Sequence, residues 1–159
     1  MITSEVVDQA CSEVNGYDEQ RMMSEFDAFF KEQPSICDFI TELTSESSLE
    51  IQELSLFLSY MVFKTVKMGQ SSPINQVTSE NVEAAYRESE TWLDRINQEG
   101  DLAEIPAETE PYLIQYVISE LNQPLENGKL LDDEEKGEVF FVLKTVISSL
   151  TRSPLGQVI

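Results

Sequence analysis

The sequence predicts an all-α protein of about seven helices. In every long segment, apolar residues recur at intervals of three or four positions, which is the period of an amphipathic helix. Capping residues precede these segments, and Gly or Pro follows most of them. No segment alternates apolar and polar residues in the way that a half-buried strand requires. We therefore expect a single helical domain over residues 1–159, packed around two long apolar helices.

Four helices are expected in the first half of the chain, at about 4–15, 18–32, 35–44 and 48–68. Ser4, Asp18 and Ser35 are the candidate capping residues of the first three helices. The fourth helix carries apolar residues around almost its whole circumference. Because a helix that is apolar on all sides must be covered on all sides, we expect it to lie at the centre of the fold.

Three helices are expected in the second half, at about 79–98, 111–122 and 133–152. The first of these, with Thr78 or Ser79 as its cap, has few apolar residues and should be peripheral. Pro111 suits the first position of the next helix, where its missing N–H costs nothing. Asp132 and Glu135 form a reciprocal capping pair at the start of the last helix.

The two long apolar helices, at about 48–68 and 133–152, should supply the core. Six of their residues are expected to be deeply buried: Phe57, Met61, Val66, Phe140, Leu143 and Ile147. Truncating a buried Phe typically costs about 3–5 kcal/mol, so these positions should dominate the stability of the fold.

Two stretches of the chain resemble one another. The segment 62–66 reads VFKTV and the segment 142–146 reads VLKTV. They are preceded by ICDFITEL at 36–43 and IQYVISEL at 114–121, and an insertion of two residues brings both pairs into one register. Convergent helical patterning is the alternative explanation, but the shared order of short helix, loop and long helix favours a tandem duplication.

The duplication predicts two three-helix units, at about 17–73 and 79–154, behind a lead helix. Related units that pack side by side leave a groove along their seam. Grooves between helices are common docking places for a peptide or a helix. We therefore expect a partner to bind between the two units.

The charge balance restricts the class of partner. The chain has 30 acidic and 10 basic residues, which give a formal net charge of −20. Such a surface repels nucleic acids and anionic membranes, and it suits a basic protein surface. Cys11 and Cys37 lie among apolar residues, which predicts buried free thiols in a reducing compartment. The first residues lack the basic and apolar segments of a signal peptide, so we expect a cytoplasmic protein.

Catalytic and metal-binding patterns are weak. The chain has no histidine, which removes the commonest general base and zinc ligand. The loop 123–135 resembles the second half of an EF-hand through Asn127, Gly128, Leu130 and Glu134. Its first half fails, because Gln123 and Leu125 stand where acidic or amide ligands are usual. An Asn-Gly turn explains this loop better, and we expect no metal, no cofactor and no enzymatic activity.

These observations predict a non-enzymatic protein–protein interaction module, such as an adaptor, a subunit or a small homo-oligomer. The alternative is an acidic inhibitor or nucleic-acid mimic that covers a basic protein surface. A third explanation of the acidic composition is that the carboxylates only keep the protein solvated and bind no partner. Binding by a mimic should fall steeply with ionic strength, whereas packing in a groove should fall little.

Tyr112 and Tyr116 are the candidate partner-binding residues. They lie one turn apart on the helix 111–122 and on a different face from its apolar stripe, which comprises Ile114, Val117, Ile118 and Leu121. Exposed aromatic side chains dominate the energetics of many interfaces. Partial burial against the acidic loop 99–110 is the simpler explanation for two tyrosines at these positions.

Overall fold

The computed structural model describes residues 2–70, 73–99 and 110–151, with the side chains of 96–99 left out. Within these residues the chain forms seven α-helices and no strand, so the all-α prediction is confirmed. The helices are α1 (Ser4–Asn15), α2 (Glu19–Glu32), α3 (Pro34–Leu43), α4 (Leu49–Gly69), α5 (Ser79–Glu99), α6 (Pro111–Leu121) and α7 (Asp133–Thr151).

Local side chains explain where most of these helices begin. The carboxylate of Asp18 accepts a hydrogen bond of 2.7 Å from a backbone N–H in the first turn of α2. Asp132 and Glu135 each accept from the other's backbone N–H, at 2.8 and 3.0 Å, which is the predicted reciprocal cap of α7. Pro111 opens α6 as expected. The hydroxyl of Thr78 accepts from a backbone N–H at 3.2 Å at the start of α5.

Two of the capping predictions were wrong. Thr3, rather than Ser4, caps α1, because the Thr3 hydroxyl oxygen accepts from the N–H of Val6 at 3.3 Å. Helix α3 begins at Pro34 itself, one residue before the predicted cap Ser35. A proline is well suited to the first turn of a helix, since its fixed φ angle is already helical and no N–H bond is lost there.

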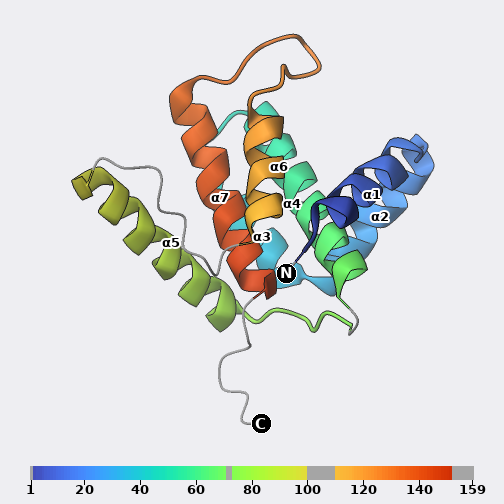
Figure 1. Ribbon diagram of the computed structural model, residues 1–159, viewed down its shortest axis with the longest axis horizontal. Coiled ribbons are helices and arrows are strands. Elements are labelled where there is room, and N and C mark those ends of the chain that lie inside the picture. The colour runs from blue at the N-terminus through green and yellow to red at the C-terminus, as the bar shows by residue number, and fades with distance from the viewer. Residues whose placement is uncertain (1, 71–72, 100–109, 152–159) are drawn as a thin grey trace.

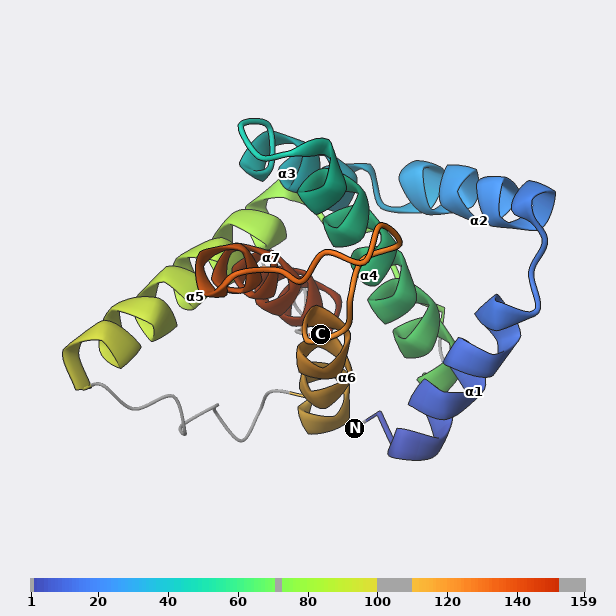
Figure 2. The ribbon, with the colours of Figure 1, turned by 90° about the horizontal axis from the view of Figure 1, so that it is seen from above.

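Helices α4 and α7 lie against each other at the centre of the molecule (Figures 1 and 2). Helix α3 packs on both members of this pair, whereas α6 packs on α7 and α1. Helices α1 and α2 lie on the side of α4, whereas α5 packs on α7 and extends away from the central group on the opposite side. In the described residues, no helix has the length and apolar character that crossing a membrane requires.

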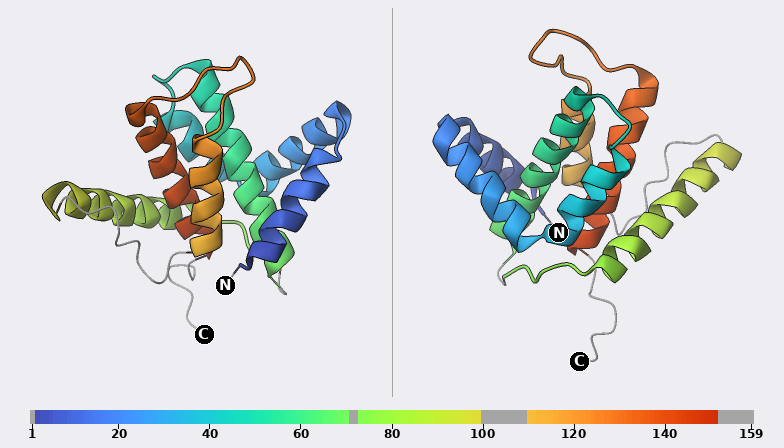
Figure 3. Two further views of the ribbon diagram at one scale, coloured as in Figure 1. Left: turned by 45° about the horizontal axis from the view of Figure 1, so that its top comes forward. Right: turned by 180° about the vertical axis from the view of Figure 1, so that it is seen from behind.

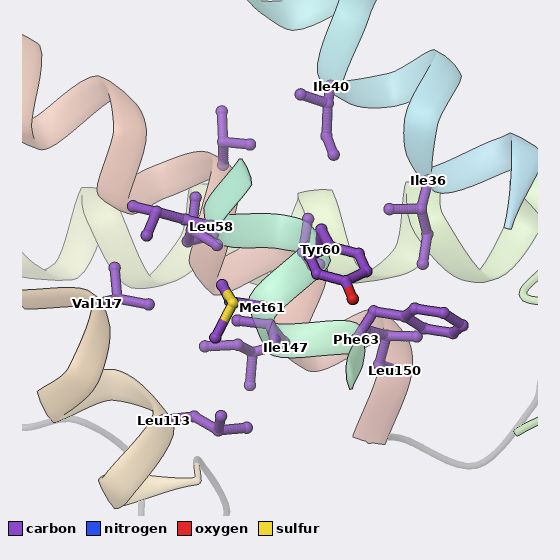
Figure 4. Close-up of a cluster of buried hydrophobic side chains, with 14 of the residues drawn as sticks. Ile36, Ile40, Leu58, Tyr60, Met61, Phe63, Leu113, Val117, Ile147 and Leu150 are labelled. Carbon is purple, nitrogen blue, oxygen red and sulfur yellow. The ribbon is translucent and has the colours of Figure 1, made fainter. Parts of the chain in front are cut away.

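The core lies between α3, α4, α6 and α7, as Figure 4 shows. It contains the aromatic rings of Tyr60 and Phe63 and aliphatic or thioether side chains, all at most 5% exposed, among them Ile36, Ile40, Leu58, Met61, Leu113, Val117, Ile147 and Leu150. Of the six predicted core residues, Met61, Val66, Leu143 and Ile147 are buried. The prediction was wrong for Phe57 and Phe140, which are half-buried at the outer edges of the core, against rings of α2 and α5.

The two VxKTV segments have similar surroundings on α4 and α7. Their valines are all buried: Val62, Val66, Val142 and Val146. The hydroxyls of Thr65 and Thr145 each donate to the backbone carbonyl four residues earlier, at 2.6 and 3.0 Å. Duplication and convergence both account for this likeness, and the duplication stays a prediction.

The interface between α5 and α7 is partly polar. The hydroxyls of Thr145 and Ser89 are hydrogen-bonded to each other at 2.9 Å, and both side chains are fully buried. The ammonium of Lys144 lies 5.3 Å from the ring centroid of Trp92, and the lysine is 2% exposed. Burial lowers the pKa of Lys144, while the negative charge of Glu88 acts in the opposite direction. These contacts fix α5 on α7 and so determine where α5 meets α3.

Candidate protein-binding groove

A groove of about 740 Å³ separates α3 from the first half of α5. The two helices fall in the ranges of different predicted three-helix units, 17–73 and 79–154, and the existence of these units stays a prediction. Figure 3 shows, in its right-hand view, that α3 and α5 diverge from neighbouring N-terminal ends. The hydroxyls of Ser35 and Ser79 lie 3.3 Å apart at this narrow end, and the groove widens toward the C-terminal end of α3.

The floor of the groove is apolar and comes from both helices. We define the apolar floor as Phe39, Leu43, Val82 and Tyr86. The ring centroids of Phe39 and Tyr86 lie 5.9 Å apart in an edge-to-face arrangement, and Tyr86 packs in the same way on Phe141 of α7 at 5.5 Å. Edge-to-face contacts of this kind stabilise the arrangement of the rings, so Phe39, Tyr86 and Phe141 support one another at the floor.

One edge of the groove is acidic. We define the acidic rim as Asp38, Glu42 and Glu46, which are exposed; the first two lie on α3 and the third lies in the turn that follows it. Glu83 stands on the opposite edge, but its carboxylate already binds the guanidinium of Arg87 at 2.6 Å. No basic residue is among those that line the groove, and no ion pair of the described residues involves the acidic rim.

The structure places the two predicted tyrosines elsewhere, on α6. Tyr112 is 40% exposed. Tyr116 is half-buried and packs against the core beside Cys11 of α1. Burial raises the pKa of the Tyr116 phenol, with the nearby charge of Glu120 adding to the effect. Neither tyrosine lines the groove, and their role in partner binding stays a prediction.

The prediction was wrong for Ile118, which is 41% exposed rather than part of the buried stripe of α6. The buried face of α6 consists of Leu113, Ile114, Val117 and Leu121. The acidic loop that was expected to cover the tyrosines falls mostly on 100–109, outside the described residues.

The two tyrosines should respond differently to substitution. Tyr112→Ser is expected to change the free energy of unfolding by no more than about 0.5 kcal/mol, as exposed positions usually do. Tyr116→Ser should cost about 1–3 kcal/mol, because it removes a half-buried ring from the contact between α6 and α1. Urea denaturation of both variants measures the difference. Equal costs would mean that the two side chains share one environment.

The loop 123–131 forms a turn. Gly128 has a φ angle of +83°, which explains the choice of glycine there. The side-chain oxygen of Asn127 accepts from the N–H of Lys129 at 2.9 Å, and its amide donates to Glu50 at 2.9 Å. In the described part of the chain, no group of three or more His, Cys, Asp or Glu side chains is placed to hold a metal ion.

The groove therefore offers carboxylates, hydroxyls and apolar side chains on one surface, a combination that suits the binding of an amphipathic segment. Comparisons of the chain with protein-family models, with curated proteins and with solved structures found no match. The physical properties of the groove are therefore the basis for a proposed function.

Proposed function

We propose that the chain is a non-enzymatic protein–protein interaction module that binds a positively charged partner in the groove between α3 and α5. The observation that carries this proposal is the pairing of an apolar floor with an acidic rim. Apolar side chains supply affinity when they leave water, and charges at the edge favour a partner of opposite sign.

Typical free energies indicate how much of the binding affinity the apolar floor and the acidic rim would each contribute. An exposed ion pair contributes about 0–1 kcal/mol, so the three rim carboxylates together supply at most about 3 kcal/mol. Burying one large apolar side chain of the partner contributes about 1.5–3 kcal/mol. Two or three apolar anchors on the floor would therefore provide most of the affinity. The rim and the formal net charge of −20 would speed association and select basic partners.

The alternative is an acidic inhibitor or nucleic-acid mimic, for which the negative charge of the whole surface matters. The formal net charge of −20 favours it. A cytoplasmic location remains part of the main proposal and is supported by two free cysteines, Cys11 and Cys37. Self-association into a small homo-oligomer is compatible with an interaction module.

Affinity capture from an extract of the native cell tests the proposal. The rim variant carries Asp38→Asn, Glu42→Gln and Glu46→Gln. The control variant carries Asp8→Asn, Glu19→Gln and Asp27→Asn, which remove the same charge from exposed positions on α1 and α2. The rim variant should lose most of its main partner, by about tenfold, while the control variant captures as much as the wild type. Capture by the wild type should persist in part at high salt.

The two candidate functions predict different results in this experiment. A mimic acts through its overall charge, so both variants would weaken capture equally and high salt would abolish it. Equal capture by the wild type and the rim variant would contradict the groove proposal. Thermal denaturation of both variants verifies that they fold.

A further inference from the structure

We infer that the groove takes a short basic amphipathic α-helix of a second protein, rather than an extended peptide. This inference depends on the proposed function, and it adds the conformation and the residue pattern of the bound segment. Three features carry it: the type of secondary structure beside the groove, the spacing of the residues along its walls, and the charge of the chain.

The backbone of the bound segment is the first consideration. One way in which an extended peptide binds is to add a strand to the edge of a sheet, which pairs its N–H and C=O groups. The described residues contain no strand, so the groove offers no such edge. An extended peptide on the apolar floor would leave backbone groups buried and unpaired, which costs free energy. A helix satisfies its backbone hydrogen bonds internally and avoids this cost.

The spacing of the wall residues is the second consideration. Phe39 and Leu43 lie four residues apart on α3, and Val82 and Tyr86 lie four residues apart on α5. Each pair forms a ridge of side chains along its helix, and such ridges fit the grooves of a third helix. Asp38 and Glu42 of the rim follow the same interval along α3, and Glu46 lies in the turn after it. They therefore face cationic side chains that recur at helical spacing on a partner.

The length of the groove wall on α3 sets the size of the partner segment. From Ser35 to Leu43 this wall covers about 12 Å, at a helical rise of about 1.5 Å per residue. A partner helix of about eight residues matches this length, and one further turn would reach Glu46 in the turn that follows α3. The segment should thus contain about twelve residues, with leucine-like residues on one face and Lys or Arg beside them.

The charge of the chain indicates whether a second copy of the chain or a different protein occupies the groove. Only 10 of 159 residues are basic, and the formal net charge is −20, so two copies repel each other. The groove itself has no basic lining residue to offset this repulsion. A basic helix of a different protein is the occupant with the complementary charge.

Two synthetic peptides of about twelve residues and identical Leu, Lys and Ala composition test the inference. In the helical-order peptide the leucines recur at intervals of three and four, whereas in the strand-order peptide they alternate with lysines. Both are labelled and titrated with the full chain, and binding is followed by fluorescence anisotropy. The helical-order peptide should bind at least about tenfold more tightly than the strand-order peptide. Its affinity should fall about tenfold in the rim variant and stay unchanged in the control variant.

The conformation of the bound peptide is a second readout. Isolated helices of this length are marginal in water, so helix formation on binding can be observed. Carbon chemical shifts of an isotope-labelled helical-order peptide should become helical in the complex. Equal affinities of the two peptides, or a bound peptide without helical shifts, would overturn the inference but leave the proposed function standing. If neither peptide binds in a rim-dependent way, both are wrong.

Discussion

Replacing Phe29 by alanine is expected to lower the free energy of unfolding by about 3–5 kcal/mol, the range typical of truncated core phenylalanines. Phe29 is fully buried, and it is the one α2 residue that is. Its ring stacks on Phe63 of α4 at a centroid distance of 5.0 Å and meets Tyr60 edge-on at 6.2 Å. Removing it leaves a cavity at the only fully buried contact of α2, so α2 loses its main attachment to α4.

The neighbouring residue provides a matched control, because Phe30→Ala makes the same chemical change one position further along α2. Phe30 is 41% exposed, and its truncation should cost less than about 1 kcal/mol. Urea denaturation followed by circular dichroism measures both variants under one set of conditions. A cost for Phe30→Ala equal to that for Phe29→Ala would show that α2 packs on α4 through a different face.

The order and type of the helices follow from local sequence. Asp18 and the pair Asp132 and Glu135 mark helix starts because their side chains bind backbone N–H groups within three residues, and Pro111 marks one through its fixed φ angle. Such signals need no knowledge of the rest of the fold. The choice between Thr3 and Ser4 could not be made in this way, since both are good caps and stand side by side.

Burial at the edges of the core could not be predicted so well. The helical period shows which residues share a face, but the way neighbouring helices cross decides how far that face is covered. Phe57 and Phe140 lie on apolar faces of α4 and α7, yet α2 and α5 cover them only in part. Phe29 is fully covered because it faces the middle of α4. The same reason explains the exposure of Ile118 on α6.

The repeat pattern predicts a binding surface between two units, and this stays a prediction. The candidate groove lies between α3 and α5, which fall in the predicted ranges 17–73 and 79–154, and its residues were not predicted. Its floor was missed because Phe39 and Leu43 share the apolar face of α3 with buried Ile36 and Ile40, and sequence alone does not separate a groove wall from a core. Three acidic residues at intervals of four, from Asp38 to Glu46, were the one available signal. In a chain with 30 acidic residues, that signal is weak.

Alkaline pH should remove the part of the stability that depends on the protonated thiol of Cys37. Burial, with a smaller contribution from the charge of Asp38, raises the pKa of Cys37 from 9.0 to about 12. Between these two values the unfolded chain loses the thiol proton while the folded chain keeps it. The unfolded state then binds fewer protons, so the free energy of unfolding falls as pH rises.

The size of this loss follows from the two pKa values of Cys37. At pH 11 the stability lost through this single thiol amounts to about 2–3 kcal/mol, at about 1.4 kcal/mol per pKa unit. Other groups also ionise in this range, so the thiol has to be isolated by comparison. Urea denaturation gives the free energy of unfolding of the wild type and of Cys37→Ala at pH 8 and at pH 11. The difference between the two proteins should be smaller at pH 11 than at pH 8 by that amount.

Cys11 is the matched control, since its thiol is only half-buried and burial raises its pKa as well. The advantage of the wild type over Cys11→Ala should shrink less between pH 8 and pH 11, because water already solvates part of that thiolate in the folded state. An advantage over Cys37→Ala that stays constant with pH would mean that the folded protein accommodates a thiolate at this position. Helix α3 would then pack less tightly on α4 and α7 than its buried residues indicate, and the wall of the groove that α3 forms would be less rigid.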